Sequence, residues 1–192
     1  MTTKNGKKLL PIHKQFIEQH LVYHYEFSDS YLCKHIYTQE DVLIEKFFYS
    51  FPCPFDLSNY ISAQTMNRKI LASVSTMLRT FTVIREKTFT WYVSEHILGD
   101  FVDIFINGQS MPISQIKYLF FLMAQTVQIL HGHRLSINDW RPKNIMMSST
   151  MVKFINYAGL HSIGTVSNDD TIAFLGDPRW MAPEMLLSDS YS

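Results

Sequence analysis

The stretch "INDWRPKNIMM" (residues 137–147) places an acid, a base, a proline and an asparagine at fixed intervals before an apolar run. Asp139 and Asn144 lie five residues apart, with Arg141 between them. In this arrangement Asp139 could accept a hydroxyl proton and Arg141 could hold a phosphate group. The alternative is structural, because Asp and Asn side chains often hydrogen-bond the backbone of their own loop. The spacing therefore marks a candidate site for which both interpretations stay open.

Composition indicates a folded globular chain with a formal net charge of zero. Of its 192 residues, 46% are hydrophobic, and 17 basic residues balance 17 acidic ones. This balance gives no electrostatic case for nucleic acid or an anionic membrane. Cys33 and Cys53 are too few for a disulfide framework and lack metal-ligand spacing. The polar start and the lack of a long apolar run argue against a secretory signal and a membrane span. We expect a cytoplasmic location, with the nucleus as an alternative.

Strand-like segments come first in the chain and helix-like segments later. Residues 16–48 are rich in β-branched and aromatic side chains and predict strands, and residues 79–97 predict a hairpin. Helical spacing of apolar residues predicts helices over 56–78, 100–107 and 113–133. Such segregation is typical of an α+β fold, and here it predicts two lobes that meet near residues 95–100.

The order of the motifs resembles a protein kinase. The Asp139-to-Asn144 spacing is similar to the kinase catalytic loop, and "ILHGHRLSIND" resembles the helix end that leads into it. "WYVSEHILGDF" resembles the fifth strand and hinge, and "VKFINYAG" lies where kinases carry Asp-Phe-Gly. "GDPRWMAPEMLL" resembles the Ala-Pro-Glu end of the activation segment. The resemblance implies a two-lobed, kinase-like α+β fold.

The resemblance also implies a domain organisation. A flexible segment over 1–14 would precede a β-rich N-lobe over 15–96 and a partial C-lobe over 97–192. The catalytic loop would occupy 137–144 and the activation segment 156–184. The C-lobe would end just after the Ala-Pro-Glu motif, and the sequence leaves open whether the chain is a fragment or a natural truncation.

The parts that hold a nucleotide triphosphate in kinases are altered. "LVYHYEFSDSYLC" has no glycine where the resemblance places the glycine-rich loop, so side chains would obstruct the phosphates. "VLIEK" puts Glu45 at the position of the strand lysine, with Lys46 beside it. Successive strand residues face opposite ways, so only one of the two faces the nucleotide unless a bulge intervenes. The alternative for Lys46 is a solvated surface lysine. Asn67 occupies the position of the helix glutamate that would pair with the lysine.

The acid that binds magnesium in kinases is also missing. In "FINYAGL", Asn156 takes the aspartate position, and a one-residue shift would put Tyr157 there instead. Magnesium prefers anionic oxygen ligands, which neither residue supplies. We therefore predict no metal site.

Among kinase homologues without activity, the chain most resembles the Ste20-related adaptors of the STRAD family. The similarity lies in "VLIEKF", "RTFTVIREKTFTWYVSEH", "VKFINYAGLHSIG" and the Trp before Pro-Glu in "RWMAPE". The retained Asp139 departs from that family, whose loop has usually lost it. The resemblance implies an allosteric adaptor that binds a protein kinase, with ATP as an optional structural ligand held without magnesium. The implied nucleotide cleft consists of Val22, Ile44, Glu45, Lys46, Ser94, Glu95, His96, Asn144 and Asn156.

Three functions remain open from the sequence. The first is a pseudokinase that acts as an adaptor or scaffold for a protein kinase. The second is a weakly active or atypical serine/threonine kinase that uses Asp139, Arg141 and Asn144. The third is a truncated decoy that competes with an intact kinase. The joint alterations at 45, 67 and 156 favour the first.

Overall fold

The computed structural model describes residues 14–24, 28–49, 57–108, 110–137, 139–148, 150–157, 160–163 and 178–180. Their contacts divide the chain into two compact units. The first unit contains Met1–Cys53 and Thr80–His96, and the second contains Pro54–Arg79 and Ile97–Ser192. The mixed α+β class predicted from the sequence is confirmed, with a β-rich first unit.

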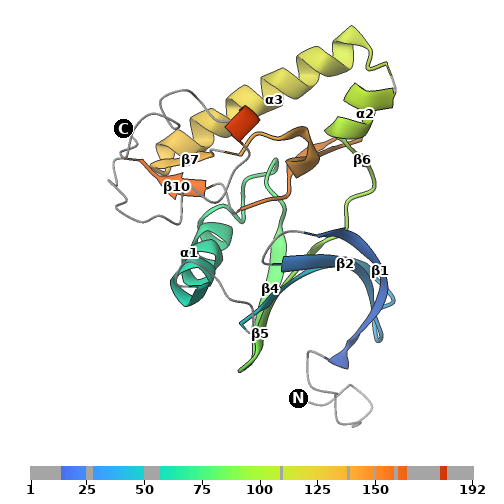
Figure 1. Ribbon diagram of the computed structural model, residues 1–192. Helices are drawn as coiled ribbons and strands as arrows, with labels where there is room; N and C mark the ends of the chain where they lie inside the picture. Colours follow the sequence, from blue (N-terminus) through green and yellow to red (C-terminus); the bar gives the residue numbers. More distant parts are fainter. Residues whose placement is uncertain are drawn as a thin grey trace. The chain divides into compact units, whose positions relative to one another are not determined.

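The first unit contains a five-stranded antiparallel sheet, drawn in blue to green in Figure 1, with the order β1-β2-β3-β5-β4. Its strands are β1 (Phe16–His24), β2 (Ser28–His35), β3 (Asp41–Phe48), β4 (Thr80–Arg85) and β5 (Phe89–Glu95). Each strand pairs antiparallel with its neighbours. Short connections join β1 to β2, β2 to β3 and β4 to β5, whereas α1 and β4 lie between β3 and β5 in the chain. The strands and the hairpin predicted over 16–48 and 79–97 are confirmed.

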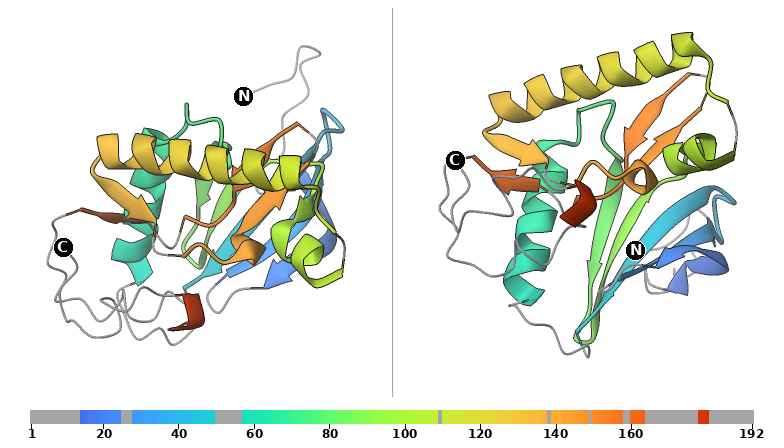
Figure 2. Two further views of the ribbon diagram at one scale, coloured as in Figure 1. Left: turned by 90° about the horizontal axis from the view of Figure 1, so that it is seen from above. Right: turned by 45° about the horizontal axis from the view of Figure 1, so that its top comes forward.

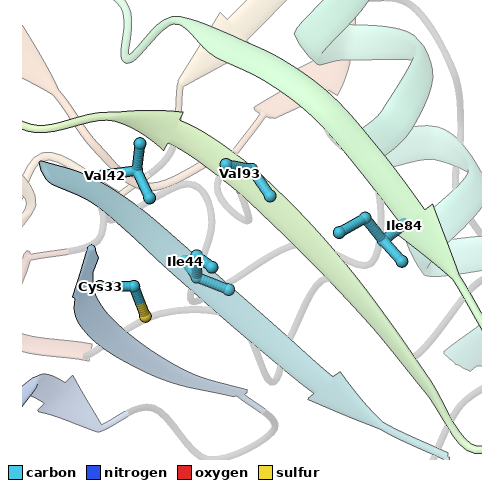
Figure 3. Packing of buried hydrophobic residues seen from close by; sticks show 5 residues of the cluster. All are labelled: Cys33, Val42, Ile44, Ile84 and Val93. Atoms are coloured by element: carbon cyan, nitrogen blue, oxygen red, sulfur yellow. The ribbon is translucent and has the colours of Figure 1, made fainter. Parts of the chain in front are cut away.

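One face of this sheet carries a compact apolar cluster. Its side chains come from four adjacent strands and point to the same side (Figure 3): Cys33, Val42, Ile44, Ile84 and Val93. All are less than a tenth exposed, and Phe16, Tyr31 and Trp91 pack against them. Alternation along β3 therefore places every second residue of the strand on this apolar side.

The second unit combines helices with two small sheets. Its helices are α1 (Leu57–Ile70), α2 (Val102–Gly108) and α3 (Ile113–Gly132), with short 3-10 turns η2 (Pro142–Asn144) and η3 (Pro178–Trp180). β6 (Asp100–Phe101), β8 (Ile145–Met147) and β9 (Val152–Phe154) form one sheet, and β7 (Leu135–Ile137) pairs with β10 (Leu160–Ser162). Figure 2 shows β7 leaving the C-terminal end of α3. None of the helices in these described segments is long and apolar enough to cross a membrane.

Helix α1 is shorter than predicted and belongs to the second unit. It ends at Ile70, whereas the sequence predicted helix to residue 78. Residues 73–76 are Ser, Val, Ser and Thr, which are weak helix formers. Beyond the helix, Leu78 donates its backbone N–H to Phe154 O at 2.9 Å. The sequence predicts α1 within the N-lobe, whereas the contacts group it with the second unit, and this pairing joins the end of its segment to β9.

Candidate functional site

Glu45 and Lys46 face opposite sides of the sheet. In the pairing with β5, Glu45 lies opposite Tyr92 and Lys46 lies opposite Trp91. The pairings of β3 with β2 and β5 run without a register shift, so no bulge turns both side chains to one side. The prediction that only one of the pair can face a given ligand is confirmed.

Lys46 is buried on the apolar side. It is 7% exposed, and its Nζ forms an ion pair with Glu18 of β1. The same Nζ lies 4.6 Å from the ring centroid of Tyr31 and 4.7 Å from that of Trp91, which is a double cation–π contact. Burial lowers the pKa of Lys46. A solvated surface lysine, the alternative interpretation of the sequence, is therefore wrong at this position.

Glu45 shares its side of the sheet with Ser94. Ser94 pairs with Leu43, which lies two residues before Glu45 on β3. Glu45 Oε1 accepts a hydrogen bond from Ser28 Oγ at 3.1 Å, and the hydroxyls of Ser94 and Thr80 lie 3.1 Å apart. This side thus presents a carboxylate where the resemblance would require a cation, together with hydroxyl groups.

The sheet separates residues that the sequence assigned to one cleft. Ile44 and Lys46 lie on the apolar side, whereas Glu45 and Ser94 lie on the other. The assignment of Ile44 and Lys46 to the same surface as Ser94 therefore does not hold, because β3 alternates its side chains. Ser28, which sequence reasoning missed, contacts Glu45 instead.

The remaining predicted cleft residues of the first unit lie at its margins. Glu95 pairs with Val42 and so follows the apolar side of the sheet. Val22 lies in β1 where the ladder with β2 shifts register, between Leu21 and Tyr23. His96 follows β5 and is half-buried. The neighbours of Glu45 follow from the pairing register of β2, β3 and β5, which the segment "VLIEK" by itself does not specify.

On α1, the buried polar positions differ from the predicted one. Asn67 is half-buried, whereas Gln64 and Arg68 are 3% and 4% exposed. The Arg68 guanidinium carbon lies 4.4 Å above the ring centroid of Tyr157. A cation thus lies one position from the residue that was aligned with the helix glutamate.

In the second unit, Asp139 and Arg141 form a bidentate ion pair. Asp139 is 5% exposed. Arg141 Nε donates to Asp139 Oδ1 at 2.6 Å, and Nη2 donates to Oδ2 at 2.5 Å. Arg141 has φ −58° and ψ 136°, the extended conformation favoured before Pro142, which begins η2. The proline therefore helps to place the guanidinium over the carboxylate two residues earlier.

Asn144 and Asn156 complete this cluster. Asn144 Nδ2 donates to the backbone oxygen of Asp139 at 3.3 Å, as the structural alternative predicted. Asn156 Nδ2 lies 3.5 Å from both Asp139 Oδ2 and Asn144 Oδ1. Both neighbours are acceptors, so the amide nitrogen must point at them. The structure thus brings together the three predicted loop residues and residue 156.

The cluster is poor in metal ligands. Among the residues that the structure describes, no group of three or more His, Cys, Asp or Glu side chains could hold a metal ion. Asp139 is the one carboxylate in the cluster of 139, 141, 144 and 156, and Arg141 takes both its oxygens. Asn138, Ala158, Gly159 and the predicted Ala-Pro-Glu motif lie outside the described residues.

Comparison with known proteins agrees with this arrangement of parts. The family described as "Protein kinase domain" matches residues 26–192. Serine/threonine-protein kinase TAO3 of Rattus norvegicus is 27% identical over 176 residues, which cover 90% of this chain and 19% of that protein. TAO3 of Homo sapiens is 27% identical over 180 residues, and human TAO2 is 26% identical over 177 residues. These alignments cover 90% and 91% of this chain and 19% and 14% of the relatives. The chain therefore spans less than a fifth of the length of these curated relatives.

Proposed function

We propose that this chain, which belongs to the protein kinase domain family, is a catalytically impaired member that acts as a binding module. In this role it would serve as an adaptor or scaffold for another protein kinase, as in the STRAD-like adaptors that its sequence resembles. Nucleotide, if it binds, would bind weakly and without help from magnesium.

The observation that carries this proposal is the pairing of both Asp139 carboxylate oxygens with the Arg141 guanidinium. A general base must accept a proton from the substrate hydroxyl, but both oxygens of Asp139 already accept from Arg141. The Asn156 amide nitrogen lies 3.5 Å from Asp139 Oδ2 and Asn144 Oδ1. The N–H groups of the Asn156 amide lie toward Asp139 Oδ2 and Asn144 Oδ1, the two oxygens that would otherwise be available to a metal cation.

The first unit supports the same proposal. Catalysis of phosphoryl transfer is almost entirely positioning and electrostatic stabilisation of the phosphates. The β3 residue aligned with the phosphate-binding lysine is Glu45, and the adjacent lysine is held on the other side of the sheet by Glu18, Tyr31 and Trp91. Loss of the cation from this side removes an attraction for phosphate and adds a repulsion.

The second candidate is an atypical serine/threonine kinase. Asp139, Arg141 and Asn144 are retained at the family spacing, and the relatives are serine/threonine-protein kinases. Such an enzyme would need Arg141 to leave Asp139 when a substrate arrives. Phosphate transfer that requires Asp139 would favour this candidate.

Thermal unfolding with magnesium, manganese and ATP tests the proposal. The wild-type melting temperature should rise little with ATP, and by the same amount with and without metal. Asn156→Asp replaces the amide by a second carboxylate, so it should gain a metal-dependent rise, since a ligand that binds only the folded state stabilises it. Asn107→Asp on the exposed face of α2 is the matched control and should gain none.

A strong magnesium-dependent rise in the wild type would contradict the proposal. So would radiolabelled phosphate transfer by the wild type that disappears in Asp139→Ala. The adaptor role predicts the converse result in a coupled assay: any stimulation of a partner kinase should persist in Asp139→Ala, provided that the variant melts as a folded protein.

A further inference from the structure

His35 is the last residue of β2, where the chain turns toward β3, and its side chain is half-buried. Its Nδ1 lies 3.1 Å from the backbone nitrogen of Thr38 and 3.0 Å from Thr38 Oγ1. Its Nε2 lies 3.3 Å from Oε1 of Gln15, the residue before β1. Both ring nitrogens are therefore hydrogen-bonded, one to the turn at 36–40 and the other to the start of β1.

The protonation state of the His35 ring follows from these partners. A backbone N–H can only donate, so Nδ1 must be the unprotonated acceptor of the Thr38 N–H. Nε2 then carries the hydrogen of the neutral ring and donates it to Gln15 Oε1. Thr38 Oγ1 accepts from Glu40 N at 3.4 Å and can donate its own hydrogen to Nδ1. The contacts thus select the neutral ring with its hydrogen on Nε2.

The same ring lies where two distant segments of backbone meet. Ile36 N donates to Gln15 O at 2.8 Å, so the turn begins beside the start of β1. Within the turn, Gln39 N donates to His35 O at 2.8 Å. Phe16 contacts the His35 ring edge-to-face, with 5.1 Å between the ring centroids, and packs against the apolar cluster. The start of β1 is therefore joined to the turn by residue 15 and to the core of the sheet by residue 16.

We propose that His35 is a pH switch, which joins the turn at 36–40 to the start of β1 in its neutral form and releases them when it gains a proton. Protonation puts a hydrogen on Nδ1, so two donors then face each other at Thr38 N. The Thr38 hydroxyl can rotate to accept from Nδ1, but the backbone N–H loses its acceptor, which favours opening of the turn. Histidine ordinarily changes its charge between about pH 5 and pH 8, so mild acid is the signal.

Release of the turn changes one edge of the five-stranded sheet. β1 is an edge strand, and Glu18, the partner of Lys46, lies two residues after Phe16. Loss of the contacts at Gln15 and Phe16 frees the start of this strand from the apolar cluster. The sheet thus presents a different edge to a partner in mild acid than at neutral pH. This inference does not depend on the proposed adaptor role.

Other titratable groups near the turn do not give the same response. Residues 14–16 and 34–41 carry five of them besides His35: Lys14, Lys34, Tyr37, Glu40 and Asp41. Lys34 and Asp41 pair with each other at 2.8 Å, and this hydrogen bond lowers the pKa of Asp41, so its carboxylate keeps its charge in mild acid. The Tyr37 ring centroid lies 5.9 Å from that of His35, and Glu40 accepts from His35 N through its backbone oxygen at 2.9 Å. Neither of these contacts requires a change of charge.

Nuclear magnetic resonance of the full chain tests the switch. At about pH 8, the nitrogen chemical shifts of His35 should show a hydrogen on Nε2 and none on Nδ1. The amides of Thr38 and Ile36 report the two contacts through their protection factors, which remove the intrinsic effect of pH on hydrogen exchange, at about pH 8 and about pH 5. Amides of β5 are the reference for global unfolding. His35→Gln removes the titration, and His20→Gln, at an exposed residue of β1, is the matched control.

Between about pH 8 and about pH 5, both protection factors should fall about 5-fold relative to β5, the factor that corresponds to one net hydrogen bond. They should be independent of pH in His35→Gln and should fall as in the wild type in His20→Gln. Thr38→Val keeps the backbone donor but removes the hydroxyl that can accept from the protonated ring, so its fall should exceed that of the wild type. This variant keeps the proposal testable if His35→Gln does not fold.

Four results would each overturn the switch. The first is a hydrogen on Nδ1 at about pH 8. The second is a wild-type protection factor at Thr38 or Ile36 that does not change with pH relative to β5. The third is a pH response that survives in His35→Gln or disappears in His20→Gln. The fourth is a fall in Thr38→Val no larger than that of the wild type.

Discussion

Two ion pairs among the described residues, one in each unit, bury charges of opposite sign. In the first unit, the Lys46 side chain is 9% exposed and its partner Glu18 is 48% exposed. In the second, the Asp139 side chain is 2% exposed and its partner Arg141 is 17% exposed. Two aromatic rings stabilise the buried cation, whereas the buried anion depends mainly on Arg141. The first arrangement holds the Lys46 ammonium on the apolar side of the sheet, and the second pairs the Asp139 carboxylate with the Arg141 guanidinium.

The largest expected effect comes from removing the more exposed partner of each pair. Arg141→Ala leaves the Asp139 carboxylate buried without its cation, which should cost about 3 kcal/mol of unfolding free energy. Glu18→Ala leaves Lys46 with its two rings, and the lost acid is half exposed, so the cost should be about 1 kcal/mol. Urea unfolding followed by circular dichroism measures both. Equal losses of unfolding free energy in the two variants would contradict the view that the aromatic rings stabilise Lys46 without its acid, whereas Asp139 depends on Arg141.

A second prediction separates the charge of Lys46 from its packing. Lys46→Met keeps a long apolar stem against Tyr31 and Trp91 and should change the unfolding free energy by less than about 1 kcal/mol, since hydrophobic replacement of a buried ion pair is often neutral. Lys46→Ala leaves a cavity and should cost about 2 kcal/mol. The measurement is the difference between the two variants in urea.

Lys34→Met is the control in the same sheet. Lys34 pairs with Asp41 at 2.8 Å, and both side chains are at least a third exposed. The unfolding free energy of Lys34→Met should lie within about 0.5 kcal/mol of the wild-type value. If Lys46→Met is as costly as Lys46→Ala, the ammonium itself and not the stem stabilises the sheet.

A third prediction uses Cys33, a titratable group in the apolar cluster beside Lys46. Burial raises the pKa of the Cys33 thiol from 9.0 to about 12. The folded state therefore holds the proton more tightly than the unfolded state, so this stabilisation is complete below pH 9 and is lost as pH rises from about 9 towards 12. By pH 10 the wild type should lose about 1 kcal/mol relative to Cys33→Ala.

The comparison with Cys33→Ala isolates the thiol, because Lys46 is common to both proteins. Burial lowers the pKa of Lys46, so its contribution runs in the opposite direction as pH rises. Parallel stability curves for the two proteins between pH 8 and pH 10 would show that the thiol is not buried in solution.

The sequence predicted what depends on local pattern. Enrichment in β-branched and aromatic residues predicted the strands β1 to β5, and helical spacing predicted α3 within one residue of its observed end. The environment of Lys46 was not predictable, because Glu18, Tyr31 and Trp91 come from three other strands and meet it only through the pairing register. The Lys46–Glu18 ion pair therefore depends on how the strands of the sheet are paired and not on the local sequence of β3.

The position of the loop at 139–144 was predictable from the sequence, but the hydrogen bonds among its side chains were not. The spacing of Asp139 and Asn144 located the cluster, and the resemblance to kinases pointed to Asn156, with Tyr157 as the alternative, at the position of the metal-binding acid. Its proximity to Asp139 joins residues 17 apart in the chain and required the fold. The closure by Arg141 depends on the backbone before Pro142, which a residue pattern leaves open.

The smallest expected effect concerns one strained residue in each unit. Arg134 and Gln39 have φ of 56° and 61°, a region that favours glycine. Arg134 is exposed, so Arg134→Gly should raise the unfolding free energy by about 0.5 kcal/mol as the strain is relieved. Gln39→Gly should gain less, because the Gln39 Nε2 bond to Ile36 O at 2.9 Å is lost with the side chain. Arg134→Ala keeps the strained backbone and removes the same side chain, so it is the control for thermal and urea unfolding. A gain in Arg134→Ala equal to that in Arg134→Gly would mean that the arginine side chain, and not its backbone, limits stability there.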